Sequence, residues 1–386
     1  MALIRRRPRN APRGRYTPKL WSVWIVAPLA LLVVGALSFG LYHYVYGLLA
    51  HAAKTQNPRK PVNVNDVIKT TVTVLTLTGA VLAGVYAYRK QLLSEGDAHR
   101  ADASQLADRY TTAAEQLGHD QAAVRLAGVY ALARLADDWE EQRQVCIDVL
   151  CAYLRMPYEP DPSAPGHKAG ERQVRHTIIR VIRDHLRVPD TPTSWCACDF
   201  DFTGATFDGG DLSGSTFCST VDFTGATFSG GEVAFGGATF SSGLSFRGAT
   251  FTAAEVFFGG ATFSGGVNFV GATFSSGRVS FVGATFSSGR ISFRGGTFSG
   301  SEVAFGSAIF NSDRVSFLGA TFSGGEVSFS GATFNSDEVS FRGATFTAGR
   351  VYFGGATFSS SAPIFDGATF TGTHVAWGNM TRPAGV

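Results

Sequence analysis

The chain has 386 residues and a formal net charge of +3 at pH 7, with 45% hydrophobic and 16% charged residues. This length allows two or three domains, and the nearly balanced charge does not mark the chain as a strongly basic or acidic protein. Five cysteines are an odd number for a chain this long and do not form the pattern of a disulfide framework, so we expect a reducing compartment.

The composition divides the chain into two parts. Of the 32 Phe, all but Phe39 lie between Phe200 and Phe370, a segment that has no Lys and is rich in Gly, Ser, Thr and Ala. Residues 199–386 contain 13 Asp or Glu and 8 Arg, whereas the N-terminal half is basic. The two parts therefore have to be interpreted separately.

Two apolar segments follow a basic cytoplasmic tail of residues 1–20. Residues 21–41 are uncharged and predict a transmembrane helix over 21–49, because about 20 apolar residues cross the hydrocarbon core. Residues 70–88 predict a second transmembrane helix over 67–88, after a short external loop of residues 50–66. A cleaved signal peptide is the alternative for the first segment, but that segment is too long and a second span follows at once.

Basic residues set the expected orientation of this membrane hairpin. The tail carries seven Arg or Lys, and Arg89, Lys90 and Arg100 follow the second span, whereas the loop between the spans carries three. Cytoplasmic segments are enriched in Lys and Arg, so both termini are predicted to be cytoplasmic. The lipid bilayer is the first expected partner.

Residues 89–188 predict a small cytosolic helical region. Apolar residues recur at helical spacing in four segments, and Asp120 is the expected N-cap of the second helix. The fourth helix is expected to bury Val174, Ile178, Val181, Ile182 and Leu186. Its other side carries the stripe His176, Arg180, Arg183 and Arg187, for which we expect a solvated face rather than an acidic partner or anionic lipid.

After a linker of residues 189–199, aromatic residues recur at fixed spacing over residues 200–378. Phe202, Phe207, Leu212 and Phe217 are five residues apart, and from Phe274 to Phe370 the gaps alternate between seven and five. Trp377 closes the series, and a polar tail of residues 379–386 follows. Within each five-residue unit a small or β-branched residue precedes the Phe by two positions, so both side chains share one face of an extended chain. The pattern predicts a solenoid with Phe, Ala and Val inside.

This five-residue pattern resembles the pentapeptide-repeat family, most directly in FDFTG ATFDG GDLSG STFCS at residues 200–219. The resemblance implies an all-β, right-handed, quadrilateral β-helix with the central Phe or Leu stacked inside. Two-residue inserts on alternate sides depart from the family pattern and predict turns of 24 residues, with bulges at two opposite corners and seven or eight coils. A flattened twelve-residue coil is the alternative. The insert charges do not discriminate between the two, but two Phe per twelve-residue turn would overfill a flat interior.

The helical region carries a second resemblance. Glu115–Gly118 and Val124–Leu132 are similar to the helical region that precedes the repeats in bacterial, membrane-anchored members of the family. This implies a two-pass protein of the bacterial plasma membrane, in which the helices cap the N-terminal end of the β-helix.

No catalytic, cofactor-binding or metal site is predicted. His374 is isolated in an insert, no phosphate-binding glycine loop is present, and Cys196, Cys198 and Cys218 lack the fourth ligand that zinc usually requires. We expect Cys198 and Cys218 to be reduced thiols stacked at the first coil. The chain is therefore predicted not to be an enzyme.

The predicted function is a membrane-anchored, non-enzymatic scaffold that presents the β-helix to a protein partner. The inserts at the corners are where the repeated sequence varies, and we expect contacts there: Arg278, Arg290, Glu302, Arg314, Glu326, Glu338 and Arg350. The alternative is a DNA mimic that protects a topoisomerase, but 13 acidic residues against 8 Arg are too mixed for it, and no nucleic acid is expected. The last coil has no cap beyond Trp377, which predicts end-to-end dimers.

Overall fold

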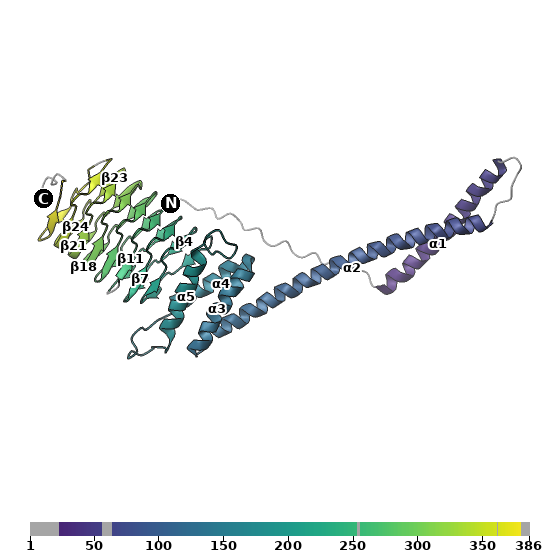
Figure 1. Cartoon of the computed structure of the whole chain (residues 1–386), viewed down its shortest axis with the longest axis horizontal. Coiled ribbons are helices and arrows are strands. Elements are labelled where there is room, and N and C mark those ends of the chain that lie inside the picture. The colour runs from purple at the N-terminus through teal and green to yellow at the C-terminus, as the bar shows by residue number, and fades with distance from the viewer. Residues whose placement is uncertain (1–22, 56–63, 253–254, 361, 380–386) are drawn as a thin grey trace. The chain divides into compact units, whose positions relative to one another are not determined.

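The computed structural model describes residues 23–55, 64–252, 255–360 and 362–379, and it forms two compact units, Met1–Ala101 and Asp102–Val386 (Figure 1). Five α-helices and a short 3-10 helix precede the strands. The helices are α1 (Val23–Thr55), α2 (Val64–Leu117), α3 (Ala122–Asp138), η1 (Glu140–Gln142), α4 (Arg143–Arg155) and α5 (Glu171–Leu186).

One helical stretch in the described part of the chain, Val64–Ser94 of α2, is long and apolar enough to cross a membrane. It includes residues 67–88, which were predicted as the second span. The first predicted span begins at residues outside the described range and otherwise lies in α1, and the structure does not support two spans. Thr71, Thr76 and Thr78 of α2 each donate to the carbonyl four residues earlier at 2.8 Å, which satisfies their hydroxyls within the apolar helix as expected.

The end of α2 and helices α3, α4 and α5 form a small helical core in the second unit. The five apolar residues expected on the buried side of α5 are all buried. Gly128 of α3 lies against the backbone of Leu117, where a Cβ atom would come within 2.5 Å of the Leu117 nitrogen. This close approach explains the glycine in the Val124–Leu132 motif. The N-cap of α3 is Gln121 rather than the predicted Asp120, and no side chain caps the helix.

The repeats form a four-sided solenoid of parallel strands, as predicted (Figure 1). Side 1 is a seven-stranded sheet of β1 (Phe200–Asp201), β5 (Val221–Asp222), β9 (Leu244–Ser245), β13 (Val267–Asn268), β17 (Arg290–Ser292), β20 (Arg314–Ser316) and β23 (Glu338–Ser340). Side 4 is a seven-stranded sheet of β4 (Thr216–Phe217), β8 (Thr239–Phe240), β12 (Thr262–Phe263), β16 (Thr285–Phe286), β19 (Ile309–Phe310), β22 (Thr333–Phe334) and β25 (Thr357–Phe358).

Sides 2 and 3 belong to one 13-stranded sheet because three long strands run around the corner between them. These strands are β18 (Thr297–Ala304), β21 (Thr321–Ser328) and β24 (Thr345–Tyr352). The other strands of side 2 are β2 (Thr206–Phe207), β6 (Thr227–Phe228), β10 (Thr250–Phe251), β14 (Thr273–Phe274) and β26 (Thr369–Phe370). The other strands of side 3 are β3 (Gly210–Asp211), β7 (Glu232–Ala234), β11 (Glu255–Phe257), β15 (Arg278–Ser280) and β27 (His374–Ala376).

The turns lengthen along the solenoid. On side 1 the ladder partners are 21 residues apart for Phe200 and Val221, 23 apart in the next two turns, and 24 apart from Val267 onward. The predicted 24-residue turn is therefore correct only for the later coils. The early turns have shorter inserts at the corners, and the five-residue sides themselves keep their length, so each Phe still lies next to a Phe.

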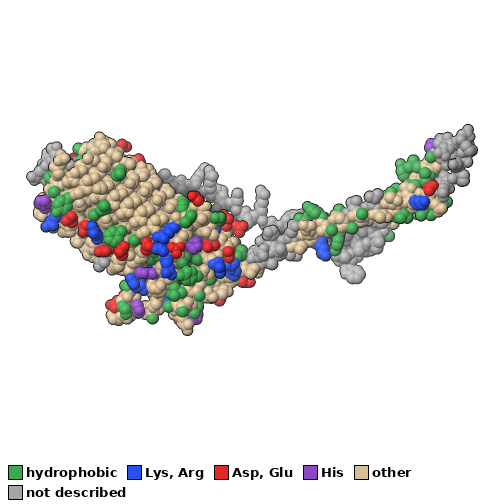
Figure 2. Space-filling model, in the orientation of Figure 1, with side chains coloured by type: hydrophobic (Ala, Val, Ile, Leu, Met, Phe, Trp, Pro, Cys, Tyr) green, Lys and Arg blue, Asp and Glu red, His purple; other side chains and the backbone are tan. Residues whose placement is uncertain are grey.

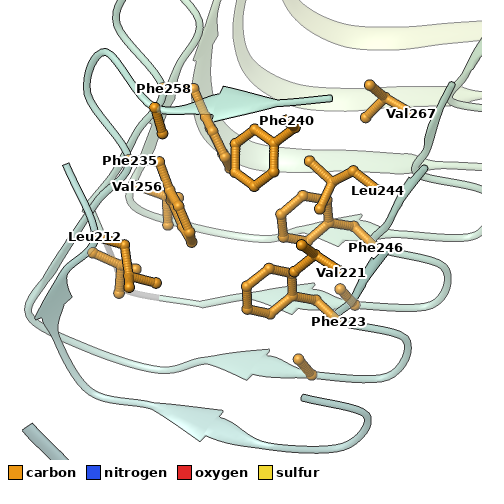
Figure 3. Close-up of a cluster of buried hydrophobic side chains, with 14 of the residues drawn as sticks. Leu212, Val221, Phe223, Phe235, Phe240, Leu244, Phe246, Val256, Phe258 and Val267 are labelled. Atoms are coloured by element: carbon orange, nitrogen blue, oxygen red, sulfur yellow. The ribbon is translucent and has the colours of Figure 1, made fainter. Parts of the chain in front are cut away.

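The interior of the solenoid consists of stacked aromatic rings. Every interior Phe from Phe200 to Phe353 is at most 2% exposed, and rings on neighbouring coils are nearly parallel, as for Phe251 and Phe274 at 4.7 Å and 5°. Figure 3 shows Phe223 and Phe246 stacked in this way beside Val221 and Leu244. Burial of this aromatic area in every coil is the main stabilising contribution.

The two ends of the solenoid differ. Helices α4 and α5 contact β1 and β3 and cover the first coil, as the sequence predicted for a cap. At the other end Phe358, Phe365, Phe370 and Trp377 are only partly buried. The last coil lacks the neighbour that buries every earlier one.

Candidate interaction surface

A column of charged side chains runs along the corner between sides 2 and 3. In the parallel ladder, residues at equivalent positions of successive coils lie next to one another. The charged column consists of Glu232, Glu255, Arg278, Glu302, Glu326, Arg350 and His374. In Figure 2 charged side chains gather in a band along one edge of the visible repeat face, and the face beside that band carries almost none.

Ion pairing within the charged column is incomplete. Arg278 and Glu302 form the predicted ion pair at 3.2 Å, with both side chains about half exposed. Glu302 and Glu326 are in register, so two like charges lie next to each other. Glu326 and Arg350 are also in register as predicted, but no salt bridge joins them in the described chain. Adjacent like charges disfavour the isolated solenoid slightly, which is consistent with selection for another purpose.

A groove of about 710 Å³ runs beside the charged column with a floor of glycines. Gly277, Gly325 and Gly349 have positive φ angles of 79°, 70° and 82°, which favour glycine. A Cβ on Gly325 would come within 2.1 Å of the Ser301 carbonyl oxygen. The floor therefore cannot carry side chains, and a partner in the groove would contact backbone on the floor and Glu302, Glu326 and Arg350 on the wall.

The other predicted contact residues lie at the opposite corner, between sides 4 and 1. Arg290 and Arg314 are in register, and Arg314 pairs with Glu338 at 2.6 Å, as the stacking at 24 residues predicted. The seven predicted corner residues thus divide into two separate columns. Those in the charged column line the groove or adjoin it, whereas those at the opposite corner form a shorter series.

The junction between the helices and the first coil holds a polar cluster that sequence reasoning missed. The carboxylate of Asp208 accepts hydrogen bonds from Tyr158 at 2.6 Å and from Arg172 at 2.9 Å, and it lies 3.0 Å from Nε2 of His176. Burial alone would raise the pKa of Asp208, but the hydrogen bonds from His176 and Tyr158 outweigh it and lower this pKa to about 2. The cluster stays ionised at neutral pH and attaches α5 to the repeats.

Two further ion pairs join the helices to the same coil. Arg155 of α4 pairs with Asp201, and Arg183 of α5 pairs with Asp211. The solvated face predicted for the stripe on α5 is therefore wrong for His176 and Arg183, which meet an acidic surface of their own chain. The available signal was the concentration of Asp in the first coil, at positions that later coils fill with Ser or Gly.

The cysteine prediction also needs correction. Cys196 and Cys218 form a disulfide with their Cα atoms 5.0 Å apart, and Cys198 is a free, partly buried thiol. The expectation of reduced thiols at the first coil, with Cys198 next to Cys218, is wrong because the amide of Cys218 bonds the carbonyl of Cys196 and brings these two residues together. Within the described ranges no cluster of three or more His, Cys, Asp or Glu residues is arranged to bind a metal ion.

The architecture is that of a parallel, four-sided β-solenoid with a helical cap. Residues 230–273 match the family model of pentapeptide repeats, described as nine copies, and this part of the solenoid has the same side and corner geometry as the coils around it. The repeat region of the chain is thus a pentapeptide-repeat β-solenoid. Searches of curated proteins and of solved structures return no match.

Proposed function

We propose that the chain is a membrane-anchored scaffold whose solenoid binds a protein partner along the charged column. The observation that carries the proposal is the register from Glu232 to His374, which places seven side chains in one line on a rigid backbone. Nothing in the solenoid interior requires charges there, because corner positions point outward. Rigid solenoids with extended surfaces are suited to recognition, so we assign the chain no catalysis.

The membrane anchor rests on α2. Val64–Ser94 is long enough to span a bilayer, and Arg89 and Lys90 near its end favour the cytoplasmic side of a bacterial plasma membrane for the residues that follow. The Cys196–Cys218 disulfide points the other way, because disulfides persist in oxidising compartments. Protease protection of the solenoid in sealed inner-membrane vesicles decides the side: digestion in inside-out vesicles only supports the cytoplasmic placement.

Two pairs of matched variants test the interaction surface. Charge reversal in the charged column by Glu302→Lys with Glu326→Lys should remove the partner that the full chain captures from its own cells. Charge reversal at the opposite corner by Arg290→Glu with Arg314→Glu should leave that partner bound. Equal capture by both variants would count against the column, and loss in both would indicate a general electrostatic contact.

A DNA mimic remains the second candidate from the sequence, and the structure adds no observation in its favour. The charged column contains four Glu, two Arg and a His, so its acidic charge is interrupted at Arg278 and Arg350. Inhibition of a topoisomerase by the purified chain would revive this candidate.

We also propose a second copy of the chain as the partner of the last coil. Phe358, Phe365, Phe370 and Trp377 are partly exposed there, and α4 and α5 block the first coil, so the two C-terminal ends are the surfaces free to meet. Light scattering of the full chain in detergent should give the dimer mass, and Trp377→Arg should give the monomer. A monomer for the unaltered chain would exclude this contact.

A further inference from the structure

A pocket of about 470 Å³ lies in the helical part of the second unit. This volume is in the range of sites that bind small molecules. The pocket is formed by the end of α2, the turn to α3, the end of α4 and the start of α5. Its lining is apolar along Leu117, Val149, Ala152, Met156 and Pro157, and polar at Arg125, Tyr153 and Glu171.

Arg125 is the central polar residue of the pocket and is 5% exposed. Its Nη1 donates to the carbonyls of His119 at 3.0 Å and Asp120 at 2.6 Å, which holds the turn between α2 and α3. Its Nη2 has only a long contact of 3.4 Å to the carbonyl of Ala169. Its Nε is buried and has no hydrogen-bond partner. Nε and Nη2 share the edge of a guanidinium that binds carboxylates and phosphates with two parallel hydrogen bonds, so this edge is underused.

Glu171 does not fill that edge. Its Oε2 lies 3.3 Å from Nη2 of Arg125 and also accepts a hydrogen bond from the Tyr153 hydroxyl at 2.8 Å. Glu171 therefore balances the buried charge without forming the paired bonds. At the rim Lys168 and Asp120 are exposed and of opposite sign. The ring Nδ1 of His119 accepts from the amide of Gln121, which leaves its Nε2 as a donor at the rim.

We propose that this pocket binds a small molecule with an oxyanion head, a carboxylate or a phosphate, and a short apolar tail. The head takes the underused edge of Arg125, helped by Lys168 and His119, and the tail lies along Leu117, Val149 and Met156. Leu117 and Arg125 belong to the two motifs of the helical region, whose other members are explained by helix contacts such as that of Gly128. The site is separate from the charged column, so the scaffold proposal stands or falls without it.

Calorimetric titration of the full chain in lipid nanodiscs tests the ligand class, with empty nanodiscs as the blank. The probes are hexanoate, hexyl phosphate and the neutral 1-hexanol. We expect a Kd between about 10 µM and 1 mM for at least one anion and at least tenfold weaker binding of hexanol. The stronger anion identifies the head group. Saturable binding of hexanol with equal affinity, or no saturable binding of either anion, would overturn the proposal.

Three variants test the position of the site. Ala152→Trp fills the apolar side without touching Arg125 and should abolish binding. Arg125→Lys keeps the charge but removes the two-nitrogen edge and should weaken binding at least tenfold, whereas Lys168→Gln should weaken it only a few fold. Should Arg125→Lys fail to fold by circular dichroism, Ala152→Trp and the hexanol comparison still decide. Unchanged affinity in Ala152→Trp would place the ligand elsewhere.

Discussion

Glu302 of β18 lies next to Arg278 of β15 in the parallel ladder, and their side chains form an ion pair at 3.2 Å on the surface of the solenoid. Both side chains are about half exposed, so water and salt screen the attraction. Arg278→Ala should therefore change the free energy of unfolding by less than about 1 kcal/mol. Denaturant unfolding followed by circular dichroism measures this change. A loss of several kcal/mol would mean that the charged column has a structural role.

The phenylalanine interior should respond very differently. Phe281 is fully buried, with Phe258 at 4.8 Å on one side and Phe305 at 5.0 Å on the other. Phe281→Ala should cost about 3–5 kcal/mol because it removes buried area and leaves a cavity in the stack. The matched change at the partly buried Phe370 of the last coil should cost clearly less. Equal losses at both positions would show that the last coil is covered in solution.

Two glycines separate the cost of backbone conformation from the cost of contact. Gly325 and Gly283 have nearly the same φ, 70° and 68°. A Cβ at Gly325 would meet the Ser301 carbonyl at 2.1 Å, whereas a Cβ at Gly283 would meet nothing within 4 Å. Gly283→Ala should cost about 1–2 kcal/mol, the strain of the left-handed conformation alone. Gly325→Ala should cost several kcal/mol more, and similar thermal unfolding of the two variants would contradict the glycine floor.

Attachment of α5 to the first coil should depend on pH through Asp208. The folded pKa of Asp208 is lowered to about 2, against an ordinary value of about 3.9. Its contribution to stability is therefore complete above about pH 4 and is lost as the pH falls towards 2. Hydrogen exchange of residues 171–186 should rise over this interval.

Asp208→Asn should bring about the same release at neutral pH, with a loss of about 3 kcal/mol because a buried network loses its charge. The control is Asp366→Asn, since Asp366 is 70% exposed and pairs with Arg342 on the surface. Exchange in α5 that is insensitive to Asp208→Asn would indicate that the apolar contacts of Ile179 and its neighbours hold the helix alone.

The disulfide closes a segment with a sequence separation of 22 residues. Cys218→Ser should lower the free energy of unfolding by about 2–4 kcal/mol under oxidising conditions and by much less in the presence of a dithiol reductant. Cys198→Ser should have no such redox dependence. Alkylation of the protein in intact cells, followed by peptide mass spectrometry, shows whether the bond exists in its own compartment; free Cys196 and Cys218 would support the cytoplasmic placement.

Much of the solenoid was predictable because its determinants are local. Alternation along an extended chain directs Phe281 and Val279 inward together, and the recurrence of the same unit means that each side meets a copy of itself. The four-sided form followed from the volume of the rings, and the in-register pairs Arg278–Glu302 and Arg314–Glu338 followed from the length of the later turns. The shorter early turns are also visible in the sequence once the inserts are counted coil by coil.

What only the tertiary structure decided lies where unlike segments meet. Asp208 contacts Tyr158 and His176, which are 50 and 32 residues away, and no repeat relates these positions. The linker brings Cys196 rather than Cys198 to Cys218, and the end of α2 meets α3 so closely that only Gly128 fits. Periodicity specifies contacts between copies of one motif, whereas the docking of the helices on the first coil depends on shape and charge complementarity between segments that share no pattern.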